Sequence, residues 1–125
     1  MLFLGIDVGS SSVKLAVLDG ESGRCVAAVQ HPQTELDIRS PQPGWAEQDP
    51  ETWWDCIVQG MRQLFTEVDG RQVSAIGIAY QMHGLVLVDD RLNVLRPSII
   101  WCDSRAVDCG RQALEDLGSE YCYGH

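Results

Sequence analysis

MLFLGIDVGSSSVKLAVLDG, residues 1–20, is the stretch that decides the fold. Apolar residues alternate on both sides of a short polar turn, which predicts two β-strands joined as a hairpin. The first strand delivers Asp7 to the turn at Gly9, Ser10, Ser11 and Ser12. Gly9 has no Cβ to block an approaching anion, and serine hydroxyls and free backbone N–H groups can donate to phosphate oxygens. The hairpin therefore predicts either a phosphate site beside a metal-binding Asp7 or an ordinary glycine-serine turn.

The composition predicts one globular domain with its own core. The chain has 125 residues, of which 45% are hydrophobic. Nine basic and eighteen acidic residues give a formal net charge of -9, and no cluster of lysine or arginine stands out. Neither nucleic acid nor an anionic membrane is therefore expected as a partner.

The cysteines indicate a reducing compartment. They number five, form no C-x-x-C pair, and with the three histidines lack the spacing of a zinc site. The N-terminal apolar run has no basic residues before it and is broken by Gly5 and Asp7, so a signal peptide is not expected. No apolar stretch approaches the roughly 20 residues that span a bilayer. The sequence predicts a soluble, cytoplasmic protein.

Further elements follow the opening hairpin. Residues 25–29 predict a third strand, which completes an antiparallel meander. The polar segment 31–49 predicts a long loop of a length that is often functional. A helix is predicted over residues 50–69, with Asp49 as its N-cap and Pro50 at its first position. Its apolar stripe is expected to face the core, and comprises Trp54, Ile57, Val58, Met61, Leu64, Phe65 and Val68.

The second half of the chain predicts a buried strand at 73–79, an irregular hairpin within 85–100 and a helix over 104–117 that stops at Gly118. Pro97 indicates that the second arm of this hairpin is an edge or is bulged.

Two loops after apolar strands carry side chains suited to a polyhydroxylated ligand. Met82 and His83 follow the strand at 73–79, and Trp101, Asp103 and Arg105 follow the next apolar run. Ligands tend to sit where strands of open α/β sheets end. Each residue also has an ordinary role: His83 as a turn residue, Asp103 as a helix N-cap and Trp101 in the core. Spacing alone favours those ordinary roles.

Four segments in order strengthen the functional interpretation. They are GIDVGSSSVK (5–14), GWAEQDPETWW (44–54), IGIAYQMHG (76–84) and LRPSIIWCDSR (95–105). Together they resemble the N-terminal portion of xylulokinases in the FGGY carbohydrate kinase family. The resemblance implies an α/β fold of the ribonuclease H-like type shared with actin and hexokinase, with a mixed sheet and flanking helices. Residues 1–125 would form the N-terminal part of domain I, with the remainder of domain I and domain II absent from this chain.

The resemblance also implies a function and a set of site residues. It implies ATP-dependent phosphorylation of a ketopentose, with xylulose as the first choice and Mg²⁺ as cofactor. By resemblance Asp7, Gly9, Ser10, Ser11 and Ser12 would face the ATP phosphates and the metal. Met82 and His83 would contact the sugar, and the same pocket would be lined by Trp101, Asp103 and Arg105.

The general base of the family lies downstream of this region, so the 125-residue piece is expected to be inactive alone. Its partners would be the sugar and ATP, and a homodimer of the parent protein is left open. The alternatives are another FGGY sugar or polyol kinase, or a non-catalytic nucleotide- or sugar-binding lobe. A metal or redox protein built on the cysteines ranks last.

Overall fold

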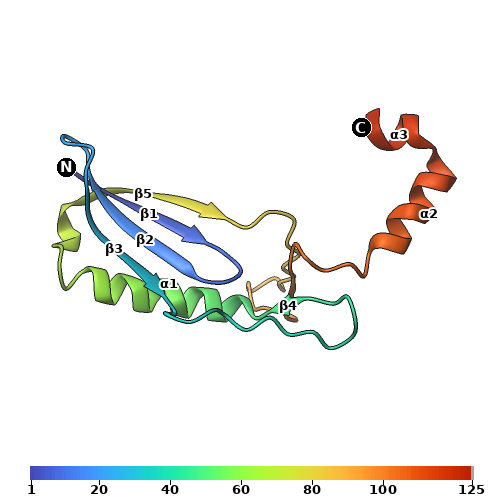
Figure 1. Ribbon diagram of the computed structural model, residues 1–125, viewed down its shortest axis with the longest axis horizontal. Coiled ribbons are helices and arrows are strands. Elements are labelled where there is room, and N and C mark those ends of the chain that lie inside the picture. The colour runs from blue at the N-terminus through green and yellow to red at the C-terminus, as the bar shows by residue number, and fades with distance from the viewer. Residues whose placement is uncertain (125) are drawn as a thin grey trace.

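The opening hairpin forms the centre of a four-stranded sheet in the computed structural model, which describes residues 1–124. Strands β1 (Leu2–Val8), β2 (Val13–Asp19) and β3 (Cys25–His31) form the predicted antiparallel meander. Strand β5 (Val73–Tyr80) pairs with β1 in parallel, which gives the order β3-β2-β1-β5 (Figure 1). The mixed α/β sheet expected from the sequence is thereby confirmed. His125, one of the three histidines considered as zinc ligands, lies outside the described residues.

Helix α1 (Pro50–Leu64) packs on one face of the sheet, beneath β2 and β3 in Figure 1. Asp49 caps it as expected, because its carboxylate accepts a hydrogen bond of 3.1 Å from Glu51 N. Buried residues on the facing sides of sheet and helix form the core, comprising Leu4, Ile6, Val13, Leu15, Val17, Ala27, Cys56 and Leu64.

Helix α1 is shorter than the predicted 50–69, and its predicted apolar stripe faces the core in part, through Ile57, Met61 and Leu64. It ends at Leu64, where the Thr66 hydroxyl donates to Gln63 O over 2.7 Å, and a short 3₁₀ helix, η1 (Gly70–Gln72), follows. Its buried residues Cys56, Gly60 and Leu64 define the inward face. Trp54 stands about 200° around the helix from Cys56. Its predicted burial is therefore wrong, and its side chain is 58% exposed.

Strand β5 was expected to be buried, and this expectation is also wrong. Ile76, Ile78 and Tyr80 are 57%, 64% and 77% exposed. They are paired with Leu4, Ile6 and Val8 of β1, but β5 is the edge strand and α1 lies over β2 and β3 instead. The alternation of the sequence identified the strand, whereas its burial depended on where the helix lies.

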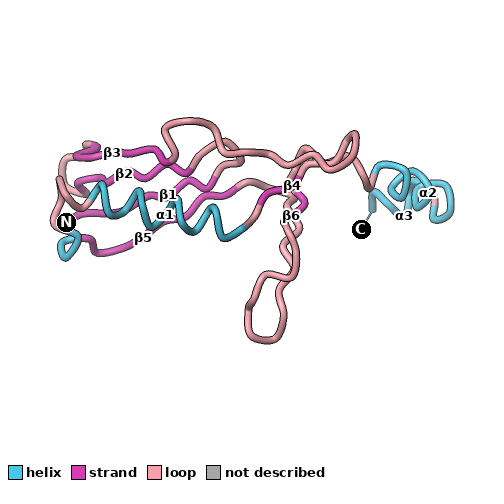
Figure 2. The backbone as a smooth tube through the Cα atoms, turned by 90° about the horizontal axis from the view of Figure 1, so that it is seen from below, coloured by secondary structure: helices cyan, strands magenta, loops and turns pink. Residues whose placement is uncertain are grey.

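The C-terminal part of the chain extends away from the sheet (Figures 1 and 2). Strands β4 (Glu47–Gln48) and β6 (Ser98–Ile99) form a small second sheet. The predicted hairpin within 85–100 is held by isolated bridges at Leu85 with Ile99 and at Val88 with Val94. Helices α2 (Val107–Leu117) and α3 (Ser119–Gly124) bury none of their described residues. Within residues 1–124, no helix is long and apolar enough to cross a membrane.

Helix α2 begins three residues later than the predicted residue 104. The carboxylate of Asp103, the expected N-cap, accepts hydrogen bonds from Ala46 N and from the Arg105 guanidinium as well as from Arg105 N. These bonds hold residues 103–105 in a turn, and the helix starts only at Val107. Gly118 ends it as predicted, with φ at +82°.

Candidate active site

Parallel pairing brings two of the predicted ligand loops to one edge of the sheet. Val8 lies opposite Tyr80 at the ends of β1 and β5, and Gln81 N donates to Val8 O over 3.0 Å. The turn at 9–12 and the loop carrying Met82 and His83 therefore leave neighbouring strands at the same edge. Such an edge is the usual ligand position in open α/β sheets.

The turn at 9–12 has its carbonyl groups bonded to the protein. Gly9 N donates to Ser12 O over 3.1 Å, and Leu36 N donates to Ser11 O over 2.7 Å. The Gln48 side chain donates to Ser10 O over 2.6 Å. A Cβ at Gly9 would come within 3.1 Å of Ser12 O, so a side chain there would crowd the turn. This arrangement keeps three carbonyl oxygens engaged, and carbonyl oxygens would repel an anion.

Asp7 stands at the end of β1 with an exposed side chain. The Asp7 carboxylate makes no hydrogen bond or ion pair with any other described residue. The described residues also contain no group of three side chains suited to hold a metal ion. Mg²⁺ commonly binds through one or two carboxylates together with water and substrate phosphates. A single free carboxylate beside the turn at 9–12 fits that manner of binding.

The loop after β5 is held in an uncommon conformation. His83 has φ at 59°, in the left-handed region, which costs energy for any residue with a Cβ. The preceding Gln81 has a buried amide whose nitrogen and oxygen find no hydrogen-bond partner among the described residues. Gln81 and His83 both line a cavity of about 420 Å³. The sequence does not single out Gln81, because only the structure shows that its amide is buried.

Trp101 reaches the turn at 9–12 from the other end of the chain. Its indole Nε1 donates to Ser10 Oγ over 3.3 Å, and its side chain is 54% exposed, so it is not a core residue. Hydrogen bonds between Leu85 and Ile99, of 2.9 and 3.2 Å, tie the segment before Trp101 to the loop after His83. The structure thus brings together three of the segments singled out in the sequence.

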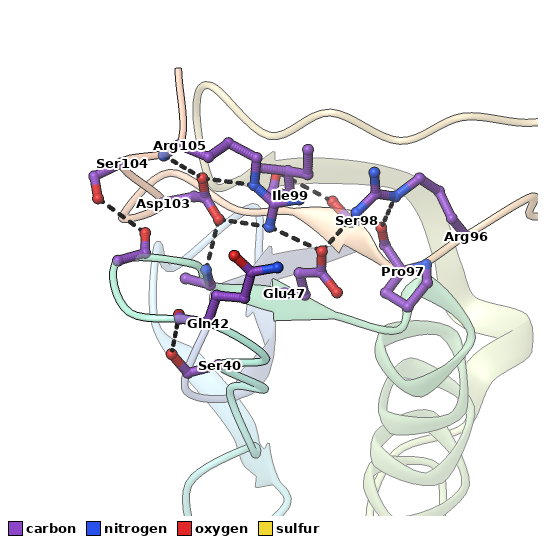
Figure 3. Close-up of polar contacts among 12 residues, drawn as sticks. Ser40, Gln42, Glu47, Arg96, Pro97, Ser98, Ile99, Asp103, Ser104 and Arg105 are labelled. Carbon is purple, nitrogen blue, oxygen red and sulfur yellow. Dashed lines mark hydrogen bonds and ion pairs between the residues drawn. The ribbon is translucent and has the colours of Figure 1, made fainter. Parts of the chain in front are cut away.

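Asp103 and Arg105 lie near these segments but are bonded to the protein (Figure 3). Asp103 accepts from Ala46 N over 2.6 Å and from the Arg105 guanidinium over 2.7 and 2.9 Å. The guanidinium also contacts Glu47 over 2.8 Å and lies 3.8 Å from the centre of the Trp45 ring. The hydrogen bonds from Arg105 hold the pKa of the Asp103 carboxyl far below its usual range, and those to Asp103 raise the pKa of Arg105. The sugar contacts expected of these two residues stay a prediction.

The dipeptide of β4 is the part of the site that sequence reasoning missed. Glu47 and Gln48 are 6% and 3% exposed. Glu47 pairs with Arg96 over 2.5 Å and with Arg105 over 2.8 Å (Figure 3). Two polar residues before a helix cap carry no periodic signal of burial. Only the length of the loop at 31–49 had indicated a function there.

The comparisons with known proteins agree with this geometry. The family described as "FGGY family of carbohydrate kinases, N-terminal domain" matches residues 2–124. The chain belongs to the FGGY family of carbohydrate kinases. It is 46% identical over 110 residues to a xylulose kinase of Escherichia coli K12, a match that covers 86% of this chain and 22% of the relative. It is 39% identical over 123 residues to an L-xylulose/3-keto-L-gulonate kinase of the same strain, covering 97% of this chain and 24% of the relative.

A solved structure supports the same assignment to the FGGY family. The crystal structure of a xylulose kinase from Rhodospirillum rubrum superposes with a TM-score of 0.86 at 30% identity. The match covers 97% of this chain and 24% of the crystallised chain. The resemblance noted in the sequence is confirmed, as is the fold shared with FGGY sugar kinases. The chain spans about a quarter of the length of the relatives it matches.

Proposed function

We propose that this chain is the N-terminal part of an ATP-dependent kinase that phosphorylates a ketopentose, with xylulose as the first candidate. The observation that carries the proposal is the pairing of β1 with β5, which sets the turn at 9–12 beside the loop at Met82 and His83. A kinase needs a phosphate site and a sugar site side by side. Two of the three relatives described above are xylulose kinases, which favours xylulose as the sugar.

In this proposal the turn at 9–12 binds the ATP phosphates. The carbonyl groups of Ser10, Ser11 and Ser12 are bonded within the protein, and the N–H groups of Ser11 and Ser12 and the serine hydroxyls donate to phosphate oxygens. The loop at Met82 and His83 orients the sugar, with the imidazole donating or accepting at a sugar hydroxyl. Positioning and charge neutralisation provide most of the catalysis in phosphoryl transfer.

Asp7 would hold Mg²⁺, directly or through water. The ion, when bound, neutralises phosphate charge during transfer. Asp7 contributes one carboxylate at the end of β1, next to the turn that binds the phosphates. Removal of the proton from the sugar hydroxyl is assigned to a base outside residues 1–125, as the resemblance implies. A cytoplasmic location, expected from the cysteines, stays a prediction.

Two alternatives stand beside a xylulose kinase. The likeness to an L-xylulose/3-keto-L-gulonate kinase favours a related sugar as substrate, because FGGY kinases of different sugars share these segments. The second alternative is the non-catalytic nucleotide- or sugar-binding lobe considered from the sequence. The open reading frame that contains this chain separates the last alternative from a complete kinase.

The test uses the complete protein that contains this chain. Asp7→Asn should lower the turnover of xylulose with saturating MgATP about a hundredfold or more, because a charged group at the phosphates is lost. Xylulose affinity, measured by calorimetry, should stay nearly unchanged. His83→Ala should instead weaken xylulose binding more than MgATP binding. Unaltered turnover of Asp7→Asn, or equal weakening of both ligands by His83→Ala, contradicts the proposed roles.

A further inference from the structure

Gln48 is buried directly beneath the turn at 9–12. The residue is 3% exposed, and its side-chain amide makes three hydrogen bonds. The nitrogen donates to Ser10 O over 2.6 Å and to Asp37 O over 3.3 Å. The oxygen accepts from Trp53 Nε1 over 3.1 Å. Nothing in the sequence analysis had assigned a role to this residue.

Its partners fix which way the amide of Gln48 points. An indole N–H can only donate, so the amide atom that faces Trp53 must be the oxygen. The nitrogen then faces two backbone carbonyls, which can only accept. Rotation of the amide by 180° would set its oxygen against the carbonyls of Ser10 and Asp37 and its nitrogen against the indole. Gln48 is therefore a fixed donor to the turn.

This donor determines where the turn presents its own N–H groups. A peptide unit is planar, and its C=O and N–H point in opposite directions. With Ser10 O held toward Gln48, the N–H of Ser11 points to the opposite side. Leu36 N holds Ser11 O in the same way and so sets the direction of the Ser12 N–H. The N–H groups of Ser11 and Ser12 therefore point away from the Gln48 amide and the Leu36 N–H.

The neighbouring residue of β4 serves a different segment. Successive side chains of a strand point to opposite sides. Glu47 is bound to Arg96 and Arg105, and Gln48 is bound to the turn at 9–12. The two buried side chains therefore separate into one that holds the segment 96–105 and one that holds the turn. Substitutions at Glu47 and Gln48 therefore compare the two roles within a single strand.

We propose that Gln48 is a positioning residue that sets the conformation of the turn at 9–12 for nucleotide phosphates. The proposal rests on the proposed kinase function. Gln48 does not touch the nucleotide. It acts through the Ser10 carbonyl, and without it that carbonyl is free to rotate toward the phosphates and repel them.

The test measures two affinities in the complete protein that contains this chain. In Gln48→Met, which keeps the volume and removes the hydrogen bonds, MgATP should bind about tenfold more weakly. Xylulose affinity should change less than about threefold, because the loop at Met82 and His83 is held by β5. Gln59→Met, on the exposed side of α1, is the matched control and should change neither affinity.

Glu47→Gln distinguishes positioning from a general loss of stability. It removes ion pairs at an equally buried site, so it destabilises the same strand without releasing Ser10. The ratio of MgATP affinity to xylulose affinity should fall in Gln48→Met and not in Glu47→Gln. If both variants change this ratio equally, or neither does, Gln48 is not a positioning residue.

Two further results have their own consequences: misfolding of Gln48→Met, and a wild-type protein without kinase function. If Gln48→Met does not fold, Trp53→Phe is measured instead, since it removes the donor that orients the amide and keeps an aromatic ring. It should weaken MgATP binding in the same direction and by less, and an unchanged MgATP affinity overturns the inference. A wild-type complete protein that neither binds MgATP nor phosphorylates a sugar refutes the proposed function itself.

Discussion

At the scale of single residues, the two nearly buried carboxylates near the site are compensated by arginine. Asp103 and Glu47 are nearly buried, and each is paired with Arg105. A buried carboxylate is tolerated only when paired and hydrogen-bonded. The ion pairs of Glu47 with Arg96 and Arg105 join segments that lie 49 and 58 residues apart in the sequence and so fix the segment leading to Trp101. Their main contribution is to geometry, since buried ion pairs add little net stability.

The pairing of Asp103 predicts a pH dependence of stability. Because hydrogen bonds from Arg105 lower its pKa in the folded chain, the contribution of Asp103 to the free energy of unfolding is complete above the unfolded pKa of about 3.9. It is lost as the pH falls through the lower folded pKa. Asp103→Asn should therefore be less stable than the wild type near neutral pH, and the difference should shrink below about pH 4.

Urea denaturation at several pH values measures this difference. Asp90→Asn, which removes an exposed carboxylate without a hydrogen bond to another described residue, controls for the loss of one charge. A difference between Asp103→Asn and the wild type that stays constant from neutral pH to about pH 3 would show that the pairing does not act in this way.

At the scale of elements, helix α1 packs tightly against β2 at Gly60. A Cβ at this position would overlap the Leu15 side chain of β2. Gly60→Leu should therefore lower the free energy of unfolding by about 1–3 kcal/mol through overpacking, although leucine is the better helix former. Gly110→Leu in α2 is the matched control, because a Cβ there meets nothing within 4 Å.

Chemical denaturation of both glycine variants provides the measurement. Gly110→Leu should leave the main unfolding transition unchanged, since α2 buries none of its residues. Equal losses in the two variants would mean that the close contact of α1 with β2 is unimportant for stability.

The elements also show what the sequence can predict. The hairpin of β1 and β2 and the start of α1 follow from local signals: alternation, a glycine turn, and Asp49 before Pro50. The exposure of β5 does not, because it depends on where α1 lies. The role of Gln48 depends on Ser10, 38 residues earlier, and that of Glu47 on arginines far downstream. Long-range partners of this kind leave no periodic pattern.

At the scale of the whole molecule, much apolar surface is uncovered. Ile76, Ile78 and Tyr80 of β5 are more than half exposed, and so is Tyr123 of α3. Exposed apolar patches favour association. We expect the 125-residue chain alone to self-associate and to show no phosphorylation of xylulose, since the base and a closing second domain are assigned outside it.

Size-exclusion chromatography and a coupled assay for ADP release test the two parts of this expectation. Xylulose-dependent turnover by a clean monomer of the 125-residue chain would contradict the assignment. The general base would then have to be sought among residues such as Asp7.

The parallel pairing of β1 with β5 has a consequence for the order of folding. The strands of the meander are neighbours in sequence, so they can pair soon after synthesis, and α1 can then cover β2 and β3. The second edge of β1 stays unpaired until residues 73–80 have been made. Contacts between such distant segments form late, because a long loop must be closed first. During translation the candidate site is therefore assembled last, after a core that does not depend on it.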